Sequence, residues 1–142
     1  MRISPDHLRM VAAAITASVG ATASEAELVA ESLVSAEMRG IPTHGVNFLP
    51  MLAERVEQGL VIVPTNAAVI MDEGAVAHID GGNGLGQVAA DLAMEKARDL
   101  VTEWQRSGEH GKMRLIRITM PPCATCCTRQ LTMVILLEFC CT

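Results

Sequence analysis

The residue of this chain that is best placed to do chemistry is a histidine in a short turn. His44 stands between Thr43 and Gly45, and the turn joins two segments whose apolar residues recur with helical spacing. We expect this histidine to be exposed and aimed by the backbone. An imidazole in that setting can give or take a proton near neutral pH. A single loop histidine is more often without a catalytic role, so the surrounding residues decide its interpretation.

Helix start and stop signals recur in the first sixty residues. The helices that they predict must position this turn. Ser4 followed by Pro5 predicts one helix start, and Thr22 with Glu25 predicts a second through a capping box. The expected helix ends are the glycines Gly20, Gly40 and Gly59. Three inward faces are expected: Leu8, Val11, Ala12, Ile15 and Val19; Ala26, Val29, Ala30 and Leu33; and Leu49, Leu52, Ala53 and Val56.

Short apolar runs and a fourth helix are expected after these helices. Residues 60–63 and 67–71 predict two strands divided by Pro64, and residues 75–80 predict a third strand after a turn at 72–74. Apolar residues at helical spacing between 88 and 100 predict the fourth helix.

The loop at residues 80–86, Asp-Gly-Gly-Asn-Gly-Leu-Gly, admits two interpretations. It follows a predicted strand and opens a helix, as a loop that binds the phosphates of a dinucleotide does. The spacing departs from Gly-x-Gly-x-x-Gly, because the last glycine would fall at Gln87. A tight strand-to-helix turn is the better interpretation, and the cofactor-binding residues stay unknown.

Two of these segments together resemble one enzyme family. Residues 39–48 read Arg-Gly-Ile-Pro-Thr-His-Gly-Val-Asn-Phe and resemble the signature Arg-Gly-x-x-Ser-His-Gly-(Val/Ile)-x-Arg of the malate/L-lactate dehydrogenase family. Residues 79–89 resemble its Asp-Gly-x-x-x-x-Gly-Gln segment. The family comprises non-Rossmann, NAD(P)-dependent 2-oxo acid oxidoreductases, including ureidoglycolate dehydrogenase and 2,3-diketo-L-gulonate reductase. The resemblance covers about residues 1–100 of a chain less than half as long as these enzymes, so we expect a truncated, N-terminal piece of one.

The resemblance implies a fold and a set of roles. The fold would be α+β: residues 1–60 would be the helical N-terminal segment of the substrate lobe, and residues 61–100 the first strands and one helix of the cofactor lobe. The reaction would transfer a hydride between NAD(P)H and a 2-oxo or 2-hydroxy acid such as malate or lactate. His44 would be catalytic, as the proton donor or acceptor. Thr43, in the place of the family's serine, would bind substrate or orient the ring; capping of the next helix is the alternative. A homodimer would be family-like.

One position departs from the family pattern. The family carries an arginine four residues after the histidine, suited to clamp a substrate carboxylate. Phe48 stands there and offers no donor, and each lost charge-assisted hydrogen bond costs about 1.5–3 kcal/mol. The nearby cations are Arg39 and Arg55, for which we expect solvation on helix surfaces.

Charge and hydropathy limit which partners the chain could bind. Residues 1–100 hold 6 Lys/Arg and 13 Asp/Glu, and no basic stripe with interleaved aromatic residues is present, which argues against nucleic-acid binding. No apolar run approaches the ~20 residues of a membrane span. The chain opens on a helix start instead of a signal peptide, so we expect a cytoplasmic protein.

Residues 101–142 form an atypical tail, which we expect to be irregular. Arg114–Met120 and Leu131–Phe139 could each pass as a strand, but no caps or turns organise them. It holds all five cysteines. Cys123 and Cys126 have the spacing of half a zinc site, with Cys140 and Cys141 as the other candidate ligands, but adjacent cysteines rarely point at one ion and no metal site is assigned. A frameshift near Leu100 is the leading explanation of the tail. Read from the third base, the codons of Trp104 and Gln105 force an alanine, and the neighbouring codons permit the Gly-Val-Ala strand that the family expects.

The sequence therefore leaves two hypotheses of different classes. The first is an NAD(P)-dependent 2-hydroxy acid dehydrogenase, or a truncated fragment too incomplete for activity by itself. The alternative is a non-catalytic, frameshifted remnant or a helical association module whose apolar helix faces attract partners. Cofactor binding separates them.

Overall fold

The computed structural model describes residues 3–73, 76–107, 114–120 and 131–137. The chain divides into two units, each with its own core: a helical unit, Met1–Asn66 with Asn83–Val88, and a sheet unit, Ala67–Gly82 with Ala89–Thr142. The α+β class predicted from the sequence is confirmed.

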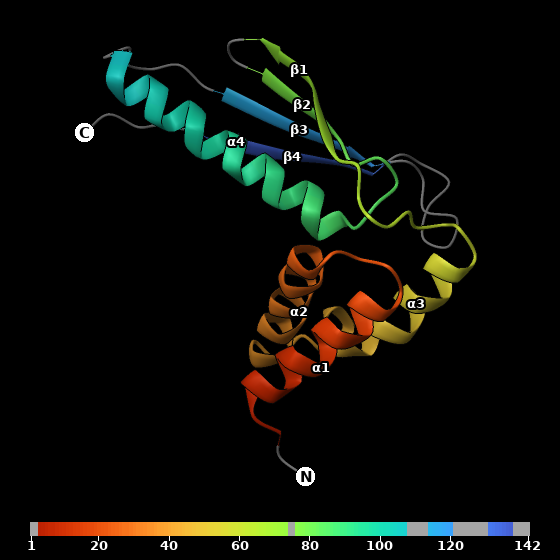
Figure 1. Cartoon of the computed structure of the whole chain (residues 1–142). Coiled ribbons are helices and arrows are strands. Elements are labelled where there is room, and N and C mark those ends of the chain that lie inside the picture. The colour runs from red at the N-terminus through yellow and green to blue at the C-terminus, as the bar shows by residue number, and fades with distance from the viewer. Residues whose placement is uncertain (1–2, 74–75, 108–113, 121–130, 138–142) are drawn as a thin grey trace. The chain divides into compact units, whose positions relative to one another are not determined.

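The helical unit contains three α-helices and the turn that carries the histidine (Figure 1). They are α1 (Pro5–Ser18), α2 (Ala23–Met38) and α3 (Leu49–Glu57), with two 3-10 turns between α2 and α3, η1 (Pro42–His44) and η2 (Val46–Phe48). Each predicted helix start is confirmed. The hydroxyl of Ser4 accepts from the backbone N–H of His7 at 3.3 Å, and Thr22 forms the expected capping box with Glu25.

The core of the helical unit follows the predicted faces closely on α2 and α3. The whole predicted face of α2 is buried, as are Leu49 and Leu52 of α3. On α1 only part of the predicted stripe is covered: Ala12 is fully buried, whereas Val11 and Ile15 are 41% and 38% exposed. The buried residues that form this core are Ala12, Ala21, Val29, Ala30, Leu33, Leu49, Leu52 and Leu85.

A buried carboxylate ties the start of α2 to the residues before and after the sheet hairpin. Glu25 is 7% exposed, and its two oxygens accept from the backbone N–H groups of Thr22 at 2.8 Å and Thr65 at 2.6 Å. The hydroxyl of Thr65 in turn accepts from the N–H of Leu85 at 3.0 Å. Burial raises the pKa of the Glu25 carboxyl, but the hydrogen bonds from Thr22 and Thr65 together outweigh burial and hold that pKa below its ordinary value.

The strand predicted at residues 60–63 is wrong. The backbone donors of this segment go to two other places: Leu60 and Val61 donate to the carbonyl of Arg55, and Ile62 donates to the carbonyl of Asn83. Because its donors are used in this way, the segment runs as an irregular stretch. Val61 still packs against the core of the helical unit, so this apolar side chain is partly buried although the segment is not a strand.

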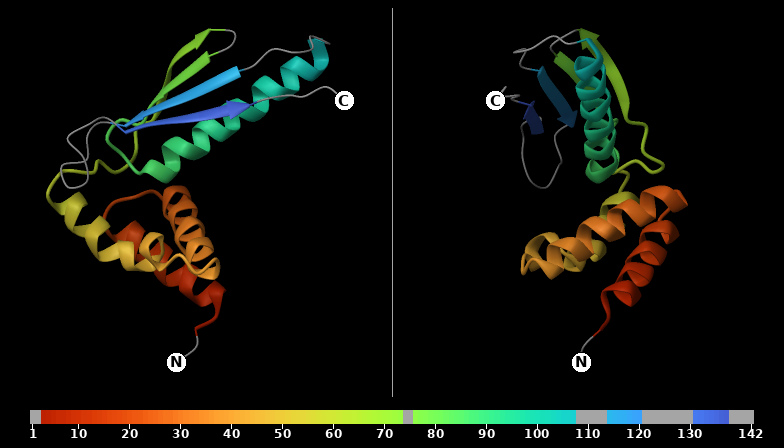
Figure 2. Two further views of the ribbon diagram at one scale, coloured as in Figure 1. Left: turned by 180° about the vertical axis from the view of Figure 1, so that it is seen from behind. Right: turned by 90° about the vertical axis from the view of Figure 1, so that its left-hand side faces the viewer.

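The sheet unit is built on two of the predicted strands and the fourth helix. β1 (Ala68–Glu73) pairs antiparallel with β2 (Val76–Asp80). α4 (Gly86–Ser107) lies along the sheet in both views of Figure 2. A small-residue stripe makes the contact: Ala89, Ala93 and Ala97 form one buried cluster with the β2 residues Ala77 and Ile79. The sequence predicts this helix, which the structure extends to Ser107.

The tail is more regular than the sequence predicts. β3 (Arg114–Met120) and β4 (Leu131–Leu137) complete a sheet of order β1-β2-β3-β4, with β2 and β3 parallel and β3 and β4 antiparallel. Both apolar runs are visible in the sequence, but no turn residues organise them there. Sheet pairing supplies the order that local signals lack.

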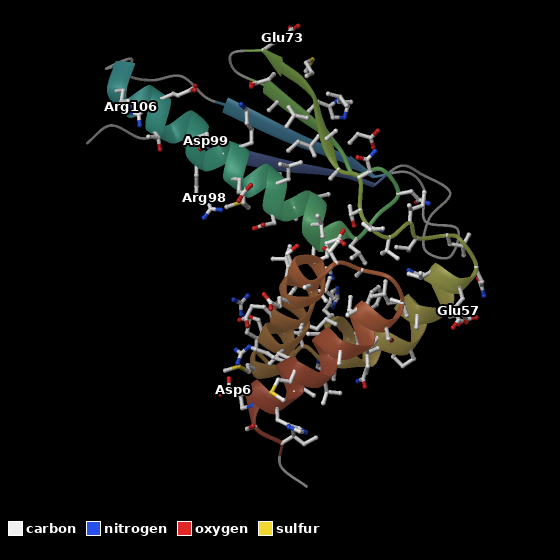
Figure 3. The ribbon with its side chains drawn as sticks, viewed as in Figure 1. Asp6, Glu57, Glu73, Arg98, Asp99 and Arg106 are labelled. Carbon is white, nitrogen blue, oxygen red and sulfur yellow. The ribbon has the colours of Figure 1, made fainter. Side chains whose placement is uncertain are left out.

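The surface is charged on the outer sides of the helices. Figure 3 labels Asp6 on α1 and Glu57 on α3 at the surface of the helical unit, and Arg98 on the side of α4 away from the sheet. Among the described helices, none combines the length and apolar character that a membrane crossing requires.

Candidate functional site

The histidine lies where the sequence predicts, in the connection between α2 and α3. Gly40, with φ +73°, ends α2 in the left-handed region that glycine adopts readily. Pro42 begins the 3-10 turn, and the N–H of His44 donates to the carbonyl of Ile41 at 3.1 Å. His44 itself is exposed. The turn is therefore held by backbone hydrogen bonds while its imidazole faces solvent.

Thr43 contacts the ring of the neighbouring histidine. Its hydroxyl lies 3.0 Å from Nδ1 of His44. The alternative role, capping of the next helix, is wrong, because Thr43 is not the N-cap residue of η2 or α3: those residues are Gly45 and Phe48, and neither gives a side-chain cap. A hydroxyl can donate to a bare nitrogen or accept from a protonated one, so this contact suits both protonation states of the ring. It leaves Nε2 as the ring nitrogen that can exchange a proton with a ligand.

Glu37, near the end of α2, also takes part in the turn, and sequence reasoning missed it. Its Oε1 accepts from the backbone N–H of Val46 at 3.0 Å. A Cβ added at Gly45 would lie 2.8 Å from Cγ of Glu37 and closer still to its carboxylate. One signal was available in the sequence, since a carboxylate in the last turn of a helix opposes the helix dipole.

The position of the family's arginine is occupied by an aromatic ring beside a buried cation. Phe48 is half-buried against the helical core, and the guanidinium carbon of Arg55 lies 6.0 Å from its ring centroid. Arg55 is only 7% exposed, so the prediction that it is solvated on the helix surface is wrong. The aromatic face lies beside the guanidinium group and replaces part of its water. Arg39 is exposed, as predicted.

The glycine loop is built as a turn, and three of its donors are used within the chain. The N–H of Gly82 donates to Asp80 at 3.0 Å, and Asn83 donates through its side chain to the carbonyl of Leu60 at 2.8 Å. A Cβ added at Gly84 would lie 2.8 Å from Cβ of Thr65. Close packing on Thr65 therefore accounts for this glycine. These contacts support the turn interpretation.

The described residues contain no group of three or more His, Cys, Asp or Glu side chains arranged to hold a metal ion. The cysteines weighed as zinc ligands, at 123, 126, 140 and 141, lie outside the described residues.

An apolar groove of about 300 Å³ lies within the helical unit, between α1 and the residues that follow the histidine. Its walls include the exposed α1 residues Val11 and Ile15 on one side and Val46 and Ala53 on the other. None of the side chains that line the groove is charged.

Comparison with known proteins places these features in a family. Residues 3–105 match the family model described as malate/L-lactate dehydrogenase. Over 103 residues the chain is 33% identical to malate dehydrogenase of Pyrococcus horikoshii, a match that covers 70% of this chain and 29% of that enzyme. It is 32% identical over 101 residues to (2R)-3-sulfolactate dehydrogenase (NADP(+)) of Chromohalobacter salexigens, covering 71% of this chain and 30% of that protein.

Solved structures agree with the sequence comparison. The structure of malate dehydrogenase from Pyrococcus horikoshii superposes with a TM-score of 0.73 at 26% identity, over 87% of this chain and 34% of that one. A dehydrogenase from Sinorhizobium meliloti gives 0.68 at 30% identity, over 84% and 35% of the two chains. The chain thus spans about a third of the length of the enzymes that it matches. On this sequence and fold similarity, the chain belongs to the malate/L-lactate dehydrogenase family.

Proposed function

We propose that this chain carries the proton-transfer turn of an NAD(P)-dependent oxidoreductase that interconverts a 2-oxo and a 2-hydroxy acid. The observation that carries the proposal is the exposed imidazole of His44, held in an ordered turn with the Thr43 hydroxyl at Nδ1. The family assignment gives the reaction class, and the site supplies an acid or base of the required kind. The proposal includes a cytoplasmic protein and a family-like homodimer.

His44 would move the proton at the substrate oxygen. In reduction, Nε2 of the imidazolium gives its proton to the oxygen of the 2-oxo group, which becomes the hydroxyl. The neutral ring that remains keeps its proton on Nδ1 and donates to the Thr43 hydroxyl. In oxidation the same nitrogen takes the proton back. Thr43 then holds the ring in one orientation through both half-reactions, because its hydroxyl accepts from Nδ1–H in either state.

We assign none of the described residues to the nicotinamide nucleotide. The loop that could have cradled its phosphates uses the N–H groups of Gly82 and Leu85 internally, on Asp80 and Thr65. In the proposal the nucleotide supplies the hydride, and the rest of a full-length protein supplies its contacts. The substrate carboxylate likewise needs a partner other than Phe48.

The test is turnover in a full-length protein. Residues 3–105 would replace the matching segment of Pyrococcus horikoshii malate dehydrogenase, and reduction of oxaloacetate would be followed by the absorbance of the reduced nicotinamide. We expect His44→Ala to lower kcat by about 10²- to 10⁴-fold, with cofactor binding unchanged. His7→Ala, an exposed histidine of α1, is the matched control. A His44→Ala protein with unaltered turnover would remove His44 from the reaction.

A second candidate is a non-catalytic helical association module. The observation in its favour is the apolar groove beside α1, together with Phe48 at the position of the family's arginine. Cofactor titration and light scattering separate the two functions. A module of this kind would self-associate without binding NADH or NADPH at any concentration, whereas a full-length enzyme built on this segment would bind one of them saturably.

A further inference from the structure

Glu37 stands where an α-helix disfavours negative charge. It is the last residue but one of α2 (Ala23–Met38), and the C-terminal turn of a helix carries the negative end of the helix dipole. Within α2, all of whose residues are described, the last turn has no basic residue to neutralise it. A carboxylate at this position therefore needs a compensating contact elsewhere.

That contact is with the turn that carries His44. Oε1 of Glu37 accepts from the N–H of Val46 at 3.0 Å, and the side chain is half-buried. Val46 begins η2, whose preceding residue, Gly45, gives no side-chain cap. The Glu37 carboxylate therefore supplies the acceptor that an N-cap side chain supplies elsewhere.

Gly45 shows that the fit is close. Its backbone, with φ −95° and ψ −157°, is open to any residue, so conformation does not require a glycine there. Space favours one, because a Cβ on residue 45 would lie 2.8 Å from Cγ of Glu37 and overlap its carboxylate, so that the Glu37 side chain would have to move away. The glycine next to the histidine and the glutamate of α2 thus occupy complementary volumes.

We propose that Glu37 is the positioning residue of His44. It holds residues 44–46 in one conformation by binding the N–H of Val46 and by filling the space beside Gly45, while Thr43 fixes the ring at Nδ1. The inference rests on the proposed role of His44 in proton transfer. Glu37 does not touch the substrate in this account. It acts by fixing the position of the His44 backbone, from which the imidazole extends.

The first experiment is nuclear magnetic resonance on the 142-residue chain. Glu37→Met keeps a side chain of similar length but no strong acceptor, and Glu37→Gln keeps the acceptor. We expect the Met variant to speed exchange of the Val46 amide by about 10- to 100-fold, since a charge-assisted hydrogen bond is lost, and to shift the His44 ring signals. The Gln variant should recover both. Glu27→Met, on the exposed side of α2, is the control. Unchanged exchange and ring signals in the Met variant would overturn the proposal.

A double-variant cycle covers the case in which the Met variant unfolds. Gly45→Ala should displace the Glu37 carboxylate and so lower the unfolding midpoint of the wild-type chain, and it should lower the midpoint much less in a Glu37→Ala background, because the overlapping carboxylate is then gone. Equal losses in the two backgrounds would overturn the proposal.

Kinetics in the full-length protein described above separate positioning from the function itself. Glu37→Met should lower kcat with KM within about twofold, as expected when only transition-state geometry is lost, and Glu37→Gln should restore it. If His44→Ala is inactive and Glu37→Met is fully active, the positioning role is refuted. If His44→Ala is fully active, the proposed function fails instead, and the amide exchange still decides whether Glu37 orders the turn.

Discussion

Replacing Glu25 should destabilise the helical unit far more than replacing a neighbouring glutamate. Its carboxylate accepts from the N–H of Thr22 and the N–H of Thr65, which are 43 positions apart in the chain. Loss of the hydrogen bond from the N–H of Thr22, which is one half of the capping box, costs about 1 kcal/mol. Loss of the charge-assisted bond to Thr65 costs about 2 kcal/mol more. Glu25→Ala should therefore lower the free energy of unfolding by about 3 kcal/mol, a large part of a typical domain's stability.

The same carboxylate makes stability depend on pH. The pKa of Glu25 in the folded chain lies below its ordinary value of 4.5, so the unfolded chain binds more protons as the pH falls through that region. The contribution of Glu25 is fully present above the unfolded pKa. It is lost as the pH falls through 4.5 and on through the lower folded pKa. Glu25→Gln, which cannot titrate, should remove this component.

The assay is urea unfolding followed by circular dichroism, at about pH 7 and at about pH 3.5, on the wild-type chain, Glu25→Ala and Glu25→Gln. Glu27→Ala, exposed on the same helix, is the matched control. The stability gap between the wild type and the Gln variant should shrink at the lower pH. Two results would refute the reasoning: a Glu25→Ala loss no larger than that of Glu27→Ala, or a gap that is the same at both pH values.

The other expectations concern activity and the origin of the tail. In the full-length protein, Phe48→Arg should lower the KM for a 2-oxo acid because it supplies a fork of donors; an unchanged or raised KM would mean that another group binds the carboxylate. The 142-residue chain alone should show no saturable NADH or NADPH binding by fluorescence and no reduction of oxaloacetate, and robust turnover would contradict this. The nucleotide sequence at about codons 98–108 should contain a second frame that restores the Gly-Val-Ala strand; a frame without it would exclude the frameshift. Limited proteolysis should trim the tail, residues 101–142, first, and early cleavage within α2 would argue against this order.

Local signals were enough to predict the helices and the place of the histidine. Ser4 and the Thr22–Glu25 capping box mark helix starts by contacts within one turn. Gly20, Gly40 and Gly59 all have positive φ near the predicted helix ends. The burial of α2 followed from its apolar spacing. Each of these features depends on residues only a few positions apart, and a sequence pattern can therefore predict it.

What the sequence did not reveal depends on contacts between distant residues. The segment 60–63 has the composition of a strand, but the carbonyls of Arg55 and Asn83 take its donors. Nothing near Arg55 in the sequence indicates that it is buried beside Phe48. Glu37 reaches across nine positions to Val46, and only its unfavourable place on the helix hints at a role. Such partners are set by tertiary packing, which residue spacing alone does not encode.

The helical unit is made of two segments that are not continuous in the chain, and this affects where the protein can be cut into fragments. Residues 67–82 are inserted into that unit, whose last segment is Asn83–Val88. On the two sides of the insertion, Thr65 binds Leu85 and Leu60 binds Asn83. A fragment cut at residue 66 would lose Leu85 from its core and leave these partners unmatched. The smallest autonomous piece should instead run to Val88 with a short linker in place of residues 67–82, since the points of insertion already lie side by side.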